Sequence, residues 1–227
     1  MEEKANTEKQ SQVLKLVNWL SDRAFNGVKP LCSAEDLAME YRIDRSFPDD
    51  ESRINALINW ETTRNFTTGF ITGLGGVITL PVSIPAALGA SWIIQARMAA
   101  AIAILSGHSL ESDRVKTFVM ACLAGDVAKA GVKNVGVRVG SGFAKSAIER
   151  IPAKTLSEIN RRVGFQLITK AGGKGAVDLM KMVPIAGGVV GGAFDAGLCR
   201  IVGKRAAKLF RREDVPDPEA EGSVILL

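Results

Sequence analysis

Residues 65–96 read NFTTGFITGLGGVITLPVSIPAALGASWIIQA and carry no charged side chain. Such an apolar run must be hidden from water, and either a protein core or a bilayer can hide it. Pro81 and Pro85 lie four positions apart, which argues against one straight helix through the whole run. We therefore expect two shorter helices, over 67–80 and 86–106, forming a Gly/Pro-rich apolar hairpin.

A second uncharged run, 182–194, reads MVPIAGGVVGGAF. It is too short to cross a bilayer alone, so a re-entrant or buried segment is expected. Glycines in both runs recur at three- or four-residue spacing, which leaves bare backbone on one helix face. Such faces allow close helix packing in a membrane, and the same spacing serves a dense soluble core. The helix-packing glycines are Gly69, Gly73, Gly76, Gly187, Gly188, Gly191 and Gly192.

Outside these runs, apolar residues recur mostly at helical spacing, so the fold class is predicted to be all-α, a helical bundle. Ser33 is expected to cap a short helix ending near Ile43, and Ser109 to cap a helix over 110–130. Three regions follow from composition: amphipathic N-terminal helices over 1–64, a Gly-rich and basic helical core over 65–212, and an acidic disordered tail over 213–227.

Charge is distributed unevenly along the chain. Residues 127–212 hold 17 basic and 4 acidic side chains, whereas residues 213–227 hold 5 acidic side chains and none that are basic. A basic block next to apolar runs favours an anionic membrane surface as partner. Nucleic acid is the rival, but aromatic residues for base stacking are scarce, so no nucleic-acid partner is expected. The cations expected to face lipid are Lys145, Arg150, Lys154, Arg161, Arg162, Lys204, Arg205 and Lys208.

The sequence offers little for catalysis. Three cysteines are far apart, and there is one histidine, so neither a metal site nor a catalytic pair is expected. The phosphate-binding patterns GxGxxG and GxxxxGK[ST] are both absent. We expect no cofactor, no metal and no enzymatic activity.

Polar side chains in apolar context are the strongest site candidates, because an unpaired buried ion costs several kcal/mol, roughly. We predict a buried network in which Arg97 and Arg200 meet Asp126 and Asp195, with Gln95 nearby. Its role is either to fix helix register or to act as a polar relay or gate.

Three stretches resemble the EcsC protein family. They are GFITGLGGVITLPVSIPAALGASWIIQARMAAAIA from Gly69, DRVKTFVMACLAG from Asp113, and INRRVGFQLITKAGGKGAVDLMKMVPIAGGVVGGAFDA from Ile159. The likeness covers roughly residues 12–212. It implies a helical, membrane-associated bacterial protein. The family's namesake is encoded beside an ABC transporter, and no enzymatic activity is established for the family.

Two main hypotheses remain open, and the lack of a matched histidine and nucleophile argues against a third, an enzyme on lipid substrates with Asp126 or Asp195 as a base. In the first, the hairpin enters the bilayer and basic helices lie on anionic lipid at the cytoplasmic face of the plasma membrane. The protein would then be an accessory to an ABC transporter, or would remodel or permeabilise the membrane, with a membrane-protein partner or a homo-oligomer both compatible. In the second, it is a cytoplasmic, soluble all-α adaptor that binds a partner protein through its Gly-rich helices.

Overall fold

One apolar helix runs through the middle of the molecule, and five of the other described helices pack around it. The computed structural model describes residues 2–66, 86–125, 148–149, 151–172 and 186–210. Within these ranges the elements are all helices, with no strand, which confirms the all-α bundle. The helices are α1 (Glu2–Asn26), α2 (Ala34–Ile43), α3 (Asp50–Phe66), α5 (Ala86–Leu105), α6 (Asp113–Ala124), α9 (Ala153–Gly172) and α11 (Ala186–Phe210).

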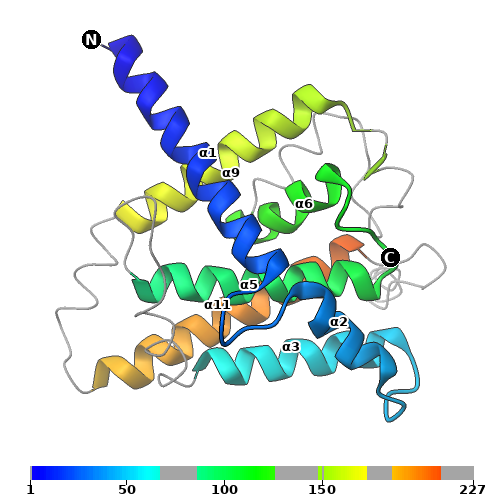
Figure 1. Cartoon of the computed structure of the whole chain (residues 1–227). Helices are drawn as coiled ribbons and strands as arrows, with labels where there is room; N and C mark the ends of the chain where they lie inside the picture. Colours follow the sequence, from blue (N-terminus) through cyan, green and yellow to red (C-terminus); the bar gives the residue numbers. More distant parts are fainter. Residues whose placement is uncertain (1, 67–85, 126–147, 150, 173–185, 211–227) are drawn as a thin grey trace, which may run out of the picture.

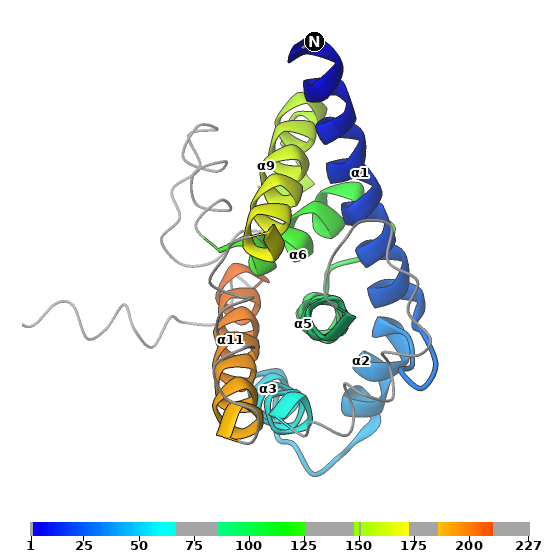
Figure 2. The same cartoon turned by 90° about the vertical axis from the view of Figure 1, so that its left-hand side faces the viewer.

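The central helix is α5, the second half of the predicted hairpin. It contacts α1, α2, α3, α6 and α11, and the view along its axis shows these helices arranged around it (Figure 2). Every residue of 89–103 is buried. The first half of the hairpin, with Gly69, Gly73 and Gly76, lies outside the described residues, as does the predicted acidic tail.

Local signals set the ends of several helices. The α5 helix begins directly after Pro85, a residue type that suits a helix start. It ends in a Schellman motif, in which the His108 N–H donates to the Ala103 carbonyl at 3.0 Å and Gly107 has φ +85°. The predicted cap of α2 is confirmed, because the Ser33 side chain accepts from the Asp36 N–H. The predicted cap of α6 is wrong: Ser112, not Ser109, is its N-cap.

A long helix includes most of the second uncharged run. The run 182–194 was expected to form a re-entrant or buried segment, and the helix α11 that begins within it at Ala186 continues to Phe210. Gly187, Gly188, Gly191 and Gly192 therefore all lie in its backbone, within the first two turns. Paired glycines lower helix propensity without forbidding a helix, and contacts with α3 and α5 accompany this one.

The directions of the helices bring four helix ends to the same end of the bundle. In Figure 1, α5 and α11 run the same way and α3 runs antiparallel to them. As a result, α3 and α9 end at the end of the bundle that faces the viewer in Figure 2, and α5 and α11 begin there. Residues 67–85 and 173–185 are therefore both joined to the bundle at this one end.

Candidate functional site

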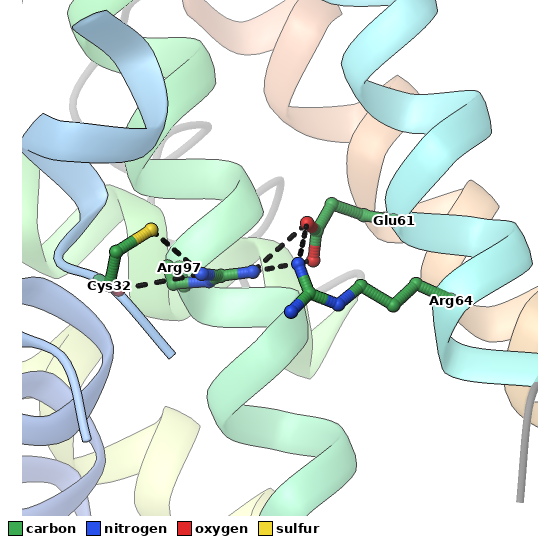
Figure 3. Close-up of polar contacts among 4 residues, drawn as sticks. All are labelled: Cys32, Glu61, Arg64 and Arg97. Atoms are coloured by element: carbon green, nitrogen blue, oxygen red, sulfur yellow. Dashed lines mark hydrogen bonds and ion pairs between the residues drawn. The ribbon is translucent and has the colours of Figure 1, made fainter. Parts of the chain in front are cut away.

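A buried arginine of α5 forms the main polar contact of the core. Arg97 is 0% exposed, and Glu61 of α3, also 0% exposed, accepts hydrogen bonds from its Nη2 at 2.9 Å through both carboxylate oxygens (Figure 3). Leaving either ion buried alone would cost several kcal/mol, roughly. The pair therefore fixes α3 against α5.

The other edge of the Arg97 guanidinium faces the segment between α1 and α2. Its Nη1 donates to the Cys32 backbone carbonyl at 3.4 Å and lies 3.3 Å from the Cys32 Sγ. Arg64, one turn after Glu61 on α3, approaches the Glu61 carboxylate at 3.8 Å (Figure 3). One guanidinium thus links α3, α5 and the segment between α1 and α2.

The charge of the Glu61 carboxylate also affects Tyr41 of α2. Burial raises the pKa of Tyr41 to about 12, and the negative charge of Glu61 contributes to this rise. A phenol in this position stays neutral at any physiological pH.

The predicted network is only partly realised. Arg97 and Gln95 are buried as expected, but Arg97 pairs with Glu61, and Gln95 donates to Ser91 Oγ at 3.0 Å within α5. The expectation that Arg200 is buried is wrong: it is exposed, and its Nη1 donates to Asn59 Oδ1 at 2.9 Å. An arginine on the outer side of α11 can reach water, so it needs no buried carboxylate.

The two aspartates of that prediction have different outcomes. Asp195 is part-buried on α11, and burial raises the pKa of its carboxyl above the ordinary value. Asp126 lies outside the described residues.

Sequence reasoning missed Glu61, although a signal for it exists. Ile54, Leu57 and Ile58 are buried on α3, and Glu61 continues their spacing by one further turn. A carboxylate at the next position of a buried stripe is a candidate partner for a buried arginine. The polar surroundings of Glu61, in the sequence WETTRN, concealed this register.

Basic side chains gather on two helices of one flank. Figure 2 places α9 and α11 on one side of the bundle and α1 and α2 on the other. On α9 and α11 the predicted lipid-facing cations are exposed except for Arg162, which is part-buried and paired with Glu158. Lys145 and Arg150 fall outside the part of the chain whose side chains are described. The exposed cations are Lys154 and Arg161 on α9, and Lys204, Arg205 and Lys208 on α11.

Two large apolar side chains are exposed on the same two helices. Phe165 is 61% exposed one turn after Arg161 on α9, and Ile201 is 45% exposed beside Arg200 on α11. Exposed apolar groups next to cations are typical of surfaces that lie at a lipid interface. We call Arg161, Phe165, Arg200, Ile201 and Lys204 the basic-apolar flank.

Two glycines that were not among those predicted allow close helix packing. A Cβ on Gly164 of α9 would lie 2.4 Å from Val13 Cγ1 of α1, and a Cβ on Gly203 of α11 would lie 2.8 Å from Ile58 Cγ1 of α3. Both glycines occur singly among polar or mixed residues, without a GxxxG repeat. Their role becomes apparent only when the opposing helix is known.

Comparison with known proteins identifies the family. The family model described as EcsC protein family matches residues 7–212. The chain belongs to the EcsC protein family. No curated protein and no solved structure matches the chain.

The EcsC match spans every described helix from early α1 to the end of α11, and residues 213–227 lie beyond it. Among the residues described in this EcsC chain, no group of three His, Cys, Asp or Glu side chains could hold a metal ion. Cys122 and Cys199 are buried, and burial raises the pKa of the Cys122 thiol to about 12. Those two thiols are therefore structural parts of the core.

Within the described ranges, one helix has the length and composition of a membrane span. It covers Leu88–Leu105, with mean hydropathy 1.6, and 89% of it is buried inside the bundle. A core helix of this kind passes the same test as a true span, so its composition alone does not place it in lipid.

Proposed function

We propose that this EcsC protein is a non-enzymatic, membrane-associated protein that docks the α9 and α11 side of its bundle on anionic lipid. The observation that carries the proposal is the basic-apolar flank, where exposed Phe165 and Ile201 stand among exposed cations. Apolar groups can enter the headgroup region while each nearby Lys or Arg contributes about 1 kcal/mol of attraction to anionic lipid.

The charge of the opposite flank, formed by α1 and α2, would orient the protein on the membrane. On α2 the charged residues are Glu35, Asp36, Glu40 and Arg42, so this helix is net acidic. A molecule with one basic and one mixed or acidic side is oriented by a negatively charged surface. The α9 and α11 side would approach the membrane and α2 would face the cytoplasm.

The burial of α5 limits which apolar residues could enter lipid. Since α5 is enclosed by five other helices, moving it into the bilayer would expose their apolar faces and the Arg97–Glu61 pair. We therefore propose that any insertion by the Gly/Pro hairpin is confined to the residues before Ala86. A peripheral protein of this kind, at the cytoplasmic face of the plasma membrane, could serve an ABC transporter, or remodel or permeabilise the membrane.

Flotation with vesicles tests the proposal. The purified chain is mixed with vesicles of phosphatidylglycerol and phosphatidylcholine, or of phosphatidylcholine alone, and floated on a density gradient. We expect flotation only with the anionic vesicles, and the doubly reversed variant Arg161→Glu/Lys204→Glu should bind at least about tenfold more weakly. The matched control is Lys15→Glu/Arg45→Glu, because both cations are exposed on α1 and the segment after α2.

A further variant separates surface attraction from apolar contact. Phe165→Ser removes an exposed ring and should leave the fold intact, yet weaken flotation at high salt, where charge is screened. If the wild-type chain stays at the bottom of the gradient with both vesicle types, or if both charge-reversal pairs act alike, the proposed docking surface is wrong.

The enclosure of α5 supports a second candidate function, a soluble all-α adaptor. In that case the chain would purify without detergent, ignore anionic vesicles and bind a protein partner. Exposed apolar residues on α2 and α3, Met39, Ile43 and Trp60, would be the first contacts to substitute.

A further inference from the structure

We propose that the acidic segment 213–227 folds back on the exposed basic face of α11 and competes with anionic lipid for it. The role of this contact rests on the proposed function, since it would regulate the same surface. The contact itself can be measured without lipid.

The basic face of α11 is a continuous stripe. Arg200, Lys204, Arg205 and Lys208 follow each other at helical spacing and all four are exposed. Residues 196–210 contain no Asp or Glu, so this part of α11 supplies no acidic residue of its own to the face. Cations near a helix C-terminus also favour the helix dipole, but that effect fades beyond the last turn and so does not account for Arg200 and Lys204.

The tail has the complementary charge and starts in the right place. Residues 213–227 hold 5 acidic and no basic side chains, and they begin three positions after the end of α11. The last residue of α11 is held in place, because His108 Nε2 lies 3.2 Å from the Phe210 carbonyl oxygen, which accepts its N–H. The helix end to which the tail is tethered is therefore held in place at one end of the stripe.

Length and local concentration make the contact feasible. The stripe from Arg200 to Lys208 extends about 12 Å along the helix axis. Fifteen residues can reach about 50 Å when extended, so the tail can cover the whole stripe. Each exposed ion pair contributes about 1 kcal/mol or less, but a tethered segment acts at an effective concentration in the millimolar range.

The acidic segment lies outside the matched family region. The EcsC match ends at residue 212, between the stripe and the first acidic residue of the tail. The tail can therefore be changed or removed without altering any residue that the family model matches.

The first experiment measures the contact without lipid. A zero-length carbodiimide joins lysine amines to carboxylates in the full-length protein, and mass spectrometry identifies the joined peptides. We expect links from the tail to Lys204 or Lys208 that disappear in 0.5 M salt, and none to Lys15 or Lys29 on the other flank. The absence of tail links to α11, or equal links to all four lysines, would overturn the proposal.

The second experiment measures competition on phosphatidylglycerol vesicles. Deleting 213–227, or replacing its five acids by Asn and Gln, should strengthen binding about five- to tenfold if the stripe is covered 80–90% of the time. A tail with the same residues in scrambled order should behave like the wild type, because charge and not sequence makes the contact. The neutralised variant keeps the apolar residues 224–227, which the deletion removes. If only the deletion weakens vesicle binding, residues 224–227 contact lipid themselves, and the proposed competition between tail and lipid is overturned.

The two proposals fail in different ways. If no variant binds vesicles, the proposed function is wrong, while the cross-links still decide whether the tail lies on α11. If vesicles bind equally with and without the tail, docking stands and the tail proposal is overturned.

Discussion

The helices α5 and α11 are both rich in small residues, mainly Ala in α5 and Gly and Ala in α11, but they differ in charge and in surroundings. The α5 helix is buried on all sides over 89–103, and its single charge, Arg97, is neutralised inside the bundle by Glu61. From residue 195 onward α11 has one buried and one exposed side, and its cations lie on the exposed one. An apolar helix is thus not in itself a membrane segment: the face on which its charges lie decides what it contacts.

Substituting one arginine in each helix gives the strongest test of this difference between α5 and α11. Arg97→Met should lower the free energy of unfolding by about 3–5 kcal/mol, because Glu61 is left as a buried, uncompensated charge. Arg200→Met should change it by no more than about 0.5 kcal/mol, since that arginine is exposed. Urea unfolding followed by circular dichroism measures both.

A double variant distinguishes loss of the pair from loss of packing. Glu61→Met/Arg97→Met removes both charges and should regain most of the stability lost in Arg97→Met. Equal destabilisation by the single and double variants would mean that packing, not charge, accounts for the loss.

Two glycines of α11 sharpen the contrast between its sides. Gly203→Ala should destabilise the fold by about 1–3 kcal/mol, because its Cβ would meet Ile58 Cγ1 at 2.8 Å. Gly197→Ala, with nothing within 4 Å of its Cβ, should stabilise the helix by up to about 1 kcal/mol. Thermal unfolding of the two variants should therefore shift in opposite directions, and a shift of the same sign would contradict the packing described for α11.

Asp195 tests whether a part-buried carboxylate on α11 lowers the free energy of unfolding. Burial raises the pKa of its carboxyl, so the folded state holds this proton more tightly than the unfolded chain does. The contribution to stability is therefore lost as the pH rises from about 3.8 through the raised pKa. Asp195→Asn should be more stable than the wild type at pH 7, by less than the effect of Gly203→Ala, and the difference should shrink on acidification. A difference that stays constant between about pH 4.5 and 7.5 would contradict this.

The smallest effect concerns Tyr41, which reports on the core pair without perturbing it. It is the only tyrosine of the chain, so tyrosinate absorbance reports on it alone. Its midpoint should lie near 12 in the folded protein and near 10 in urea, since burial is the main cause of the rise. Glu40→Gln, at an exposed residue, should lower the folded midpoint slightly by removing a negative charge. A folded midpoint near 10 would place Tyr41 outside the buried environment.

Much of the fold was predictable, because local signals decide local structure. The start of α2 at the Ser33 cap, the start of α5 after Pro85 and the basic face of α11 can all be read from neighbouring residues. Partners across the bundle could not be read in this way. Glu61 is 36 positions from Arg97, and Gly203 is opposed by Ile58 of a helix more than 140 positions earlier.

The sequence by itself determined that this chain is a helical EcsC protein with uncharged Gly-rich runs and a strong basic block near its end. Helix periodicity, caps and charge composition are properties of neighbouring residues, so no partner is needed to recognise them. Only the tertiary structure decided that the most apolar helix lies inside the bundle, that Glu61 neutralises Arg97, and that the cations share one flank with Phe165. These are properties of pairs of helices, and hydropathy along one helix carries no information about which surface covers it.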